Sequence, residues 1–207
     1  MRKIVKPLVF IVCLLPLGWL IWGGFNGQLG ANPIEAITHS TGDWTLRFLL
    51  LTLAVTPARQ LLNWPQLIKY RRMLGLYVFF YAVLHFLTYI VFDHFFDLNE
   101  ILKDIVKRPY ITVGFAALVF LIPLAVTSTN KMMKRLGKNW KKLHQLVYVI
   151  ATLGVLHFLW LVKADIRQPT IYGLLLIILL GYRAWREIVQ KKLKINRAVM
   201  NKAEVTR

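Results

Sequence analysis

Long apolar runs separated by short polar segments make up most of this chain. About 20 helical residues cross the roughly 30 Å hydrocarbon core of a bilayer, and six runs approach that length. The predicted spans are 7–25, 44–64, 73–92, 110–127, 143–162 and 170–185. Residues 93–109 mix charged and apolar positions, which predicts a short amphipathic helix at the membrane surface. The pattern therefore predicts an all-α membrane protein, in which residues 1–207 form one transmembrane domain, a six-helix bundle.

Composition and charge support a membrane protein. The chain is 57% hydrophobic with a mean hydropathy of +0.53, which is too apolar for a soluble domain. Its net charge of +18 could suggest nucleic-acid binding, but the basic residues lie between apolar runs, which favours contact with membrane lipid and no nucleic acid. Most of the 27 Lys and Arg residues lie on one side, and most of the nine acids lie on the other. Because basic loops stay in the cytoplasm, both termini are predicted to be cytoplasmic.

Three histidines lie within the predicted spans, where an ionisable residue is costly and usually functional. Measured from the basic side, His85 lies about 18 Å along the third helix and His157 about 22 Å along the fifth. These two rings are therefore predicted to pair. His144 lies near the basic end of the fifth helix, about 20 Å below His157.

Two imidazoles that face each other suit the axial positions of a haem iron, because neutral imidazole is a good iron ligand and an apolar bundle accommodates a porphyrin. We predict haem b between the third and fifth helices, with His85 and His157 as its ligands. Ala82 and Gly154, one turn before each histidine, leave room for the macrocycle. His144 suits a second, inner haem, although an ideal helix turns it about 140° away from His157. For each histidine the alternative is an ordinary hydrogen-bonding role.

The outer side carries most of the acidic residues. Its two longer loops, 26–43 and 93–109, are therefore the predicted surface for a partner protein. His39 and His94 lie in these loops and are predicted to be solvated.

Three stretches resemble one known family. They are HSTGDWTLRFLLLTLAVTPAR at 39–59, RRMLGLYVFFYAVLH at 71–85 and TSTNKMMKRLGKNWKKLHQLVYVIATLGVLH at 127–157. In this order they resemble the MsrQ (also called YedZ) family of the ferric-reductase-like transmembrane superfamily, and the resemblance covers essentially the whole chain. It implies that His85, His144 and His157 are the haem-associated histidines.

The resemblance also implies a role and its partners. A member of this family is a haem b subunit of the bacterial inner membrane that takes electrons from the respiratory quinone pool, with FMN as a further cofactor. It passes them to MsrP, a periplasmic molybdopterin enzyme that reduces methionine sulfoxide in proteins. The sulfoxide chemistry would then take place on the partner.

The third helix departs from the pattern of two-haem relatives. Those proteins have a second histidine where Arg71 and Arg72 stand here. An inner haem at His144 would be five-coordinate, use a non-histidine ligand, or be absent. The two arginines suit haem propionates or a flavin phosphate, because guanidinium pairs well with such anions. Alternatively, the two arginines serve only as positive charges that keep this loop on the cytoplasmic side.

Two other functions are compatible with these features. No G-x-G-x-x-G follows a strand pattern, and only a short tail follows the last span, so we expect the electron donor to be quinol or a separate flavin reductase. The first alternative is a transmembrane ferric or other metal reductase that is supplied by such a flavin reductase. The second is a proton-coupled transporter whose histidines relay protons, although the spans offer few polar residues for a pathway.

Overall fold

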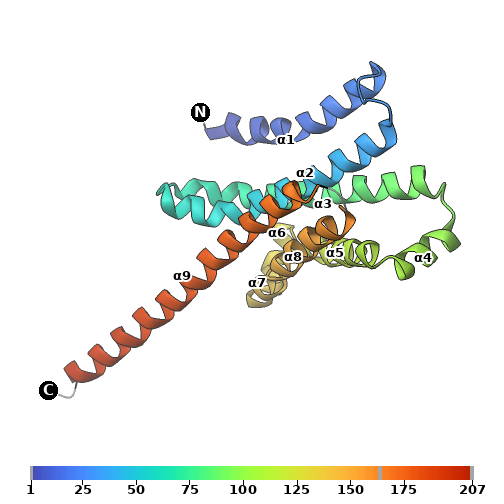
Figure 1. Ribbon diagram of the computed structural model, residues 1–207. Coiled ribbons are helices and arrows are strands. Elements are labelled where there is room, and N and C mark those ends of the chain that lie inside the picture. Colours follow the sequence, from blue (N-terminus) through green and yellow to red (C-terminus); the bar gives the residue numbers. More distant parts are fainter. Residues whose placement is uncertain (1, 163–164, 206–207) are drawn as a thin grey trace.

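The computed structural model describes residues 2–162 and 165–205, and all regular elements in these ranges are helical (Figure 1). The helices are α1 (Arg2–Phe25), α2 (Pro33–Leu61), α3 (Ile68–Thr88), α4 (Leu98–Lys107), α5 (Pro109–Val126), α6 (Asn130–Leu136), α7 (Lys138–Leu143), α8 (Leu146–Leu161) and α9 (Arg167–Val205). A 3-10 turn, η1 (Pro65–Leu67), precedes α3, and a π-helical turn, η2 (Tyr89–Asp93), follows it. The most extensive pairings are α2 with α3 and α5 with α8, and α9 extends well beyond this bundle.

Four helical segments are long and apolar enough to cross a membrane. They are Val5–Phe25, Pro65–Asp93, Pro109–Val126 and Lys138–Leu161. Large apolar side chains are exposed along them, as on α1, where Trp19 and Phe25 are 74% and 89% exposed. Such surfaces need an apolar solvent, so the chain is a membrane protein. The other two predicted spans do not reach the same apolar content. Arg47 interrupts α2, and the apolar run of α9 ends at Arg183.

The outer loops contain more helix than the sequence predicted. The prediction of a loop over 26–43 was wrong, because α2 begins at Pro33. Asn32 caps this helix: its side-chain oxygen accepts a hydrogen bond from the Glu35 N–H, and its amide donates to the Glu35 carboxylate. A capping residue followed by proline is a strong helix start. The amphipathic helix predicted within 93–109 is confirmed as α4, which Asp97 caps.

The fifth predicted span is divided. The first helical segment, α7, ends at Leu143, and α8 begins only at Leu146. His144 lies in the turn between them, so a two-residue turn interrupts the segment Lys138–Leu161, which carries both His144 and His157. The turn also removes the basis for the 140° offset, because an ideal helical rotation does not apply across a break.

Two tyrosines of α3 attach α1 to the bundle. The hydroxyl of Tyr81 donates to the Cys13 carbonyl (3.0 Å) and accepts from the Leu17 N–H (3.2 Å). These two backbone groups are four residues apart, as partners in a helix are, and the Tyr81 hydroxyl contacts both of them. The hydroxyl of Tyr77 donates to the Phe10 carbonyl at 2.8 Å. Because both side chains are almost fully buried, they fix α1 against α3.

Candidate functional site

The imidazoles of His85 on α3 and His157 on α8 face each other, with their ring centres 6.2 Å apart and their planes at 75°. The sequence predicted that these two rings would pair because they lie at similar depth, and in the structure they lie next to each other. Two imidazoles on opposite sides of one metal ion have ring centres about 6 Å apart, because each metal–nitrogen bond is about 2 Å. The spacing therefore fits axial ligation of a single metal between the rings.

Backbone carbonyls orient both rings. Nδ1 of His85 lies 3.0 Å from the Thr38 carbonyl oxygen, and Nδ1 of His157 lies 2.6 Å from that of Tyr110. A carbonyl only accepts hydrogen bonds, so each Nδ1 carries the proton and each Nε2 keeps its lone pair. Histidines that bind a metal usually donate their other ring N–H to a carbonyl or carboxylate in this way, which fixes the ring orientation.

Glycines on neighbouring helices make room for the two rings. A Cβ built on Gly114 of α5 would lie 2.8 Å from His157 Nδ1, and one on Gly42 of α2 would lie 3.1 Å from His85 Cε1. Alanine would therefore push against either ring. Gly154 has a different neighbour, because a Cβ there would meet Leu46 of α2 at 3.1 Å.

His144 shows the same hydrogen-bond pattern at the other end of the bundle. Its Nδ1 lies 3.1 Å from the Trp140 carbonyl oxygen, and its Nε2 is buried with no hydrogen-bond partner in the described part of the chain. The indole of Trp140 stacks on the ring at 3.9 Å. A buried nitrogen with an unused lone pair is costly, so it suits a ligand.

The two candidate arginines have different surroundings. Arg71 lies within electrostatic range of His144. Arg72 donates a hydrogen bond to the side-chain oxygen of Asn130 at the start of α6, so it ties α3 to the basic loop. Both arginines therefore remain predictions as contacts of an anionic cofactor group.

The prediction that His94 is solvated was wrong. Its side chain is only 13% exposed, and its Nε2 lies 3.2 Å from an Asp104 carboxylate oxygen. The other oxygen of Asp104 binds Arg108 Nε at 3.0 Å, and Tyr89 packs edge-on against the His94 ring. His39, in contrast, is exposed as predicted, with Glu35 at 4.0 Å.

An apolar cavity of about 450 Å³ lies beside His85, between α1, α2 and α3. Leu20 of α1 and Leu84 of α3 are among its lining residues. Thr41 of α2 also lines it, and the Thr41 hydroxyl lies 3.5 Å from His85 Nδ1. The cavity thus borders the residues that hold the histidine ring.

Sequence reasoning identified the histidines but missed the groups that hold them. Gly42, Gly114 and the carbonyls of Thr38 and Tyr110 come from helices other than those of the histidines they contact. Gly114 lies in a predicted span and Gly42 in a predicted loop, and a glycine in either setting does not reveal which side chain it faces.

Comparisons with known proteins identify the family of this chain. The family described as "Ferric reductase like transmembrane component" matches residues 41–155. The protein-methionine-sulfoxide reductase heme-binding subunit MsrQ of Herminiimonas arsenicoxydans is 59% identical over 190 residues, which cover 89% of this chain and 87% of that protein. The chain belongs to the MsrQ family. The MsrQ protein of Polaromonas naphthalenivorans is 50% identical over 203 residues, which cover 97% of this chain and 91% of that protein. The MsrQ protein of Caulobacter vibrioides is 50% identical over 183 residues, which cover 88% of this chain and 87% of that protein.

Proposed function

We propose that this MsrQ-family chain is a haem b membrane subunit that passes electrons from the quinone pool to a periplasmic molybdopterin methionine sulfoxide reductase of the MsrP type. The observation that carries the proposal is the His85–His157 pair, whose rings have the spacing and the tautomers of two axial ligands. The printed names of the MsrQ relatives, heme-binding subunits of a protein-methionine-sulfoxide reductase, support the same conclusion.

In that function, the residues of this chain would hold the haem and orient the histidine rings that bind it. His85 and His157 would hold the haem iron through their Nε2 atoms, while the carbonyls of Thr38 and Tyr110 keep the rings in place. Bound haem b would supply reversible one-electron transfer. We propose His144 as a ligand of a second haem, because its buried Nε2 has no partner among the described residues.

The proposed topology is six spans in a bacterial inner membrane, with both termini in the cytoplasm. In this topology α2 and α9 cross beside the four strongly apolar segments, and the basic loops stay inside. His85 and His157 then lie in the outer half of the bilayer. The segment from η2 to the start of α5 faces the periplasm and, together with residues 26–43, forms the proposed partner surface.

The proposed electron donor is a membrane quinol. The walls of the apolar cavity beside His85 are mostly aliphatic side chains of α1 and α3. Such a cavity suits an apolar donor that arrives through the lipid. For FMN, which the family resemblance implies, we propose Arg71 as the phosphate contact. Protein that retains FMN as isolated, and loses it in Arg71→Ala but not in Arg59→Ala, would support that contact.

Optical spectroscopy tests the haem sites. Detergent-purified protein from haem-replete cells should show a sharp reduced α-band of bis-histidine b-type haem. His85→Ala and His157→Ala should each abolish the outer haem, whereas the exposed control His39→Ala should resemble wild type. His144→Ala should keep the outer haem and lower the ratio of haem to protein. A colourless wild-type protein would refute the electron-transfer function and favour the transporter.

The acceptor is tested separately. The reduced protein should be reoxidised rapidly by an MsrP-type enzyme with methionine sulfoxide, and only slowly by ferric chelates. The reverse order of rates would instead favour the metal reductase.

A further inference from the structure

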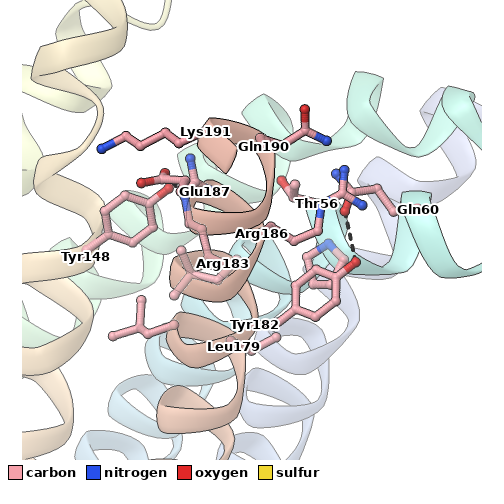
Figure 2. A pocket seen from close by; sticks show the side chains of 13 residues that line it. Thr56, Gln60, Tyr148, Leu179, Tyr182, Arg183, Arg186, Glu187, Gln190 and Lys191 are labelled. Atoms are coloured by element: carbon pink, nitrogen blue, oxygen red, sulfur yellow. Dashed lines mark hydrogen bonds and ion pairs between the residues drawn. The ribbon is translucent and has the colours of Figure 1, made fainter. Parts of the chain in front are cut away.

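A second cavity, of about 350 Å³, is lined by residues other than those around the His85–His157 pair, and Figure 2 shows it from close by. It is formed where the end of α2, the start of α8 and the middle of α9 meet. This is the level at which the apolar part of α9 gives way to its basic part. The cavity therefore lies where a lipid headgroup region would meet the protein.

The walls of this cavity differ in chemistry from one end to the other. Leu53 and Leu179 contribute to an apolar floor, whereas Arg183, Arg186 and Lys191 line the polar end. Such a division suits an amphiphile, with its charged group among the basic side chains and its apolar part below them.

The polar end has an excess of positive charge. Its one acid, Glu187, lies 3.6 Å from Arg183, so it offsets that arginine. Arg186 and Lys191 have no ion-pair partner within the described residues. Two cations without counter-ions in a partly enclosed site attract an anion.

Other side chains of the cavity are held in place. The guanidinium of Arg183 lies 4.6 Å above the Tyr148 ring, and the Tyr182 hydroxyl donates to Gln60 at 2.9 Å. Figure 2 shows these groups around the cavity, together with Thr56. The Thr56 hydroxyl is buried without a hydrogen-bond partner in the described part of the chain. It is an additional donor that a ligand oxygen would satisfy.

We propose that this cavity binds the phosphate of an anionic phospholipid. Arg186 and Lys191 would pair with the phosphate oxygens, since guanidinium and ammonium groups are the usual partners of phosphate. A volume of about 350 Å³ holds a headgroup but not two acyl chains. These would lie along the lipid-facing surface of α9, where Leu174, Ile177 and Ile178 are exposed. A neutral quinol head would leave the two cations without partners.

Lipid retention tests this proposal. Full-length protein is reconstituted in nanodiscs of phosphatidylcholine with a minor fraction of phosphatidylglycerol, re-extracted in mild detergent and examined by native mass spectrometry. Wild type should retain phosphatidylglycerol preferentially. Arg186→Gln should weaken this retention about tenfold, as expected for one lost charge-assisted contact. Arg186→Lys should restore part of it, because the charge is kept.

The matched control is Arg135→Gln, which removes the same charge from the exposed last turn of α6, between α5 and α7. It should leave retention unchanged. Equal losses in Arg186→Gln and Arg135→Gln would overturn the proposal, since general surface charge would then explain the preference. Displacement of the lipid by inorganic phosphate or by FMN at millimolar concentration would also overturn it, because the site would then take a soluble phosphate. If Arg186→Gln elutes as an aggregate, Lys191→Gln takes its place. It should weaken phosphatidylglycerol retention in the same way, and a loss equal to that of Arg135→Gln would again overturn the proposal.

Discussion

Gly114 of α5 lies so close to His157 of α8 that a Cβ at position 114 would be 2.8 Å from Nδ1 of the ring. The same ring nitrogen is hydrogen-bonded to the carbonyl of Tyr110, one turn earlier on α5. One helix therefore both makes room for the ring and holds it. Gly42 and Thr38 of α2 do the same for His85, so the two halves of the site use one design.

Gly114→Ala should displace His157 and weaken haem binding. Overpacking costs about 1–3 kcal/mol, which corresponds to a loss of affinity between about fivefold and somewhat over a hundredfold. The loss should be smaller for Gly42→Ala, where the nearest ring atom is 3.1 Å away. Haem titration of the apoprotein measures the haem affinity of each variant. Gly18→Ala is the control, because no atom lies within 4 Å of its Cβ position. Equal affinities for Gly114→Ala and Gly18→Ala would contradict the close approach.

Tyr81→Phe should loosen α1 from α3. The lost hydroxyl joins two backbone groups of α1, but these can pair with each other once it is gone. The expected loss of stability is therefore only about 1 kcal/mol. Thermal unfolding in detergent measures it, together with hydrogen exchange of the Leu17 amide. Tyr70→Phe is the control, since its hydroxyl makes no hydrogen bond within the described residues. A Tyr81→Phe protein as stable as that control would show that the Tyr81 hydroxyl contributes nothing.

Asp104→Asn should release the segment around α4 from the bundle. Asp104 is the common partner of His94 and Arg108, and its side chain is 14% exposed. We expect a loss of about 1–2 kcal/mol, mostly from the buried His94 contact, because solvent screens the exposed Arg108. Hydrogen exchange over residues 94–107 should accelerate. The neighbouring exposed Lys103→Gln should leave it unchanged, and similar exchange in the two variants would exclude a structural role for the carboxylate.

Leu20→Trp should fill the apolar cavity beside His85 and slow reduction by a soluble quinol analogue about tenfold, an effect of roughly 1.4 kcal/mol on the barrier. Reduction by dithionite should be unaffected, because that reagent does not use the cavity. Leu15→Trp is the control, because it adds the same bulk on the exposed face of the same helix, outside the cavity. Unchanged quinol kinetics in Leu20→Trp would place the donor elsewhere.

Much of this architecture is encoded locally. Runs of apolar residues near the length of a bilayer core predict membrane helices without knowledge of their neighbours. Helical rise alone then placed His85 and His157 at similar depth, and the structure brings their rings together. The amphipathic pattern of 93–109 likewise predicted a short helix, which the structure has as α4.

Other features depend on contacts between helices and left no reliable trace in the local pattern. The contact of His94 with Asp104 and the approach of Gly114 to His157 each join separate segments of the chain. The sequence by itself determined which residues enter the apolar layer and at what depth, because hydropathy and helical rise are local properties. Only the tertiary structure decided which side chains meet and which tautomers they adopt, because rotation and packing of the helices set those contacts.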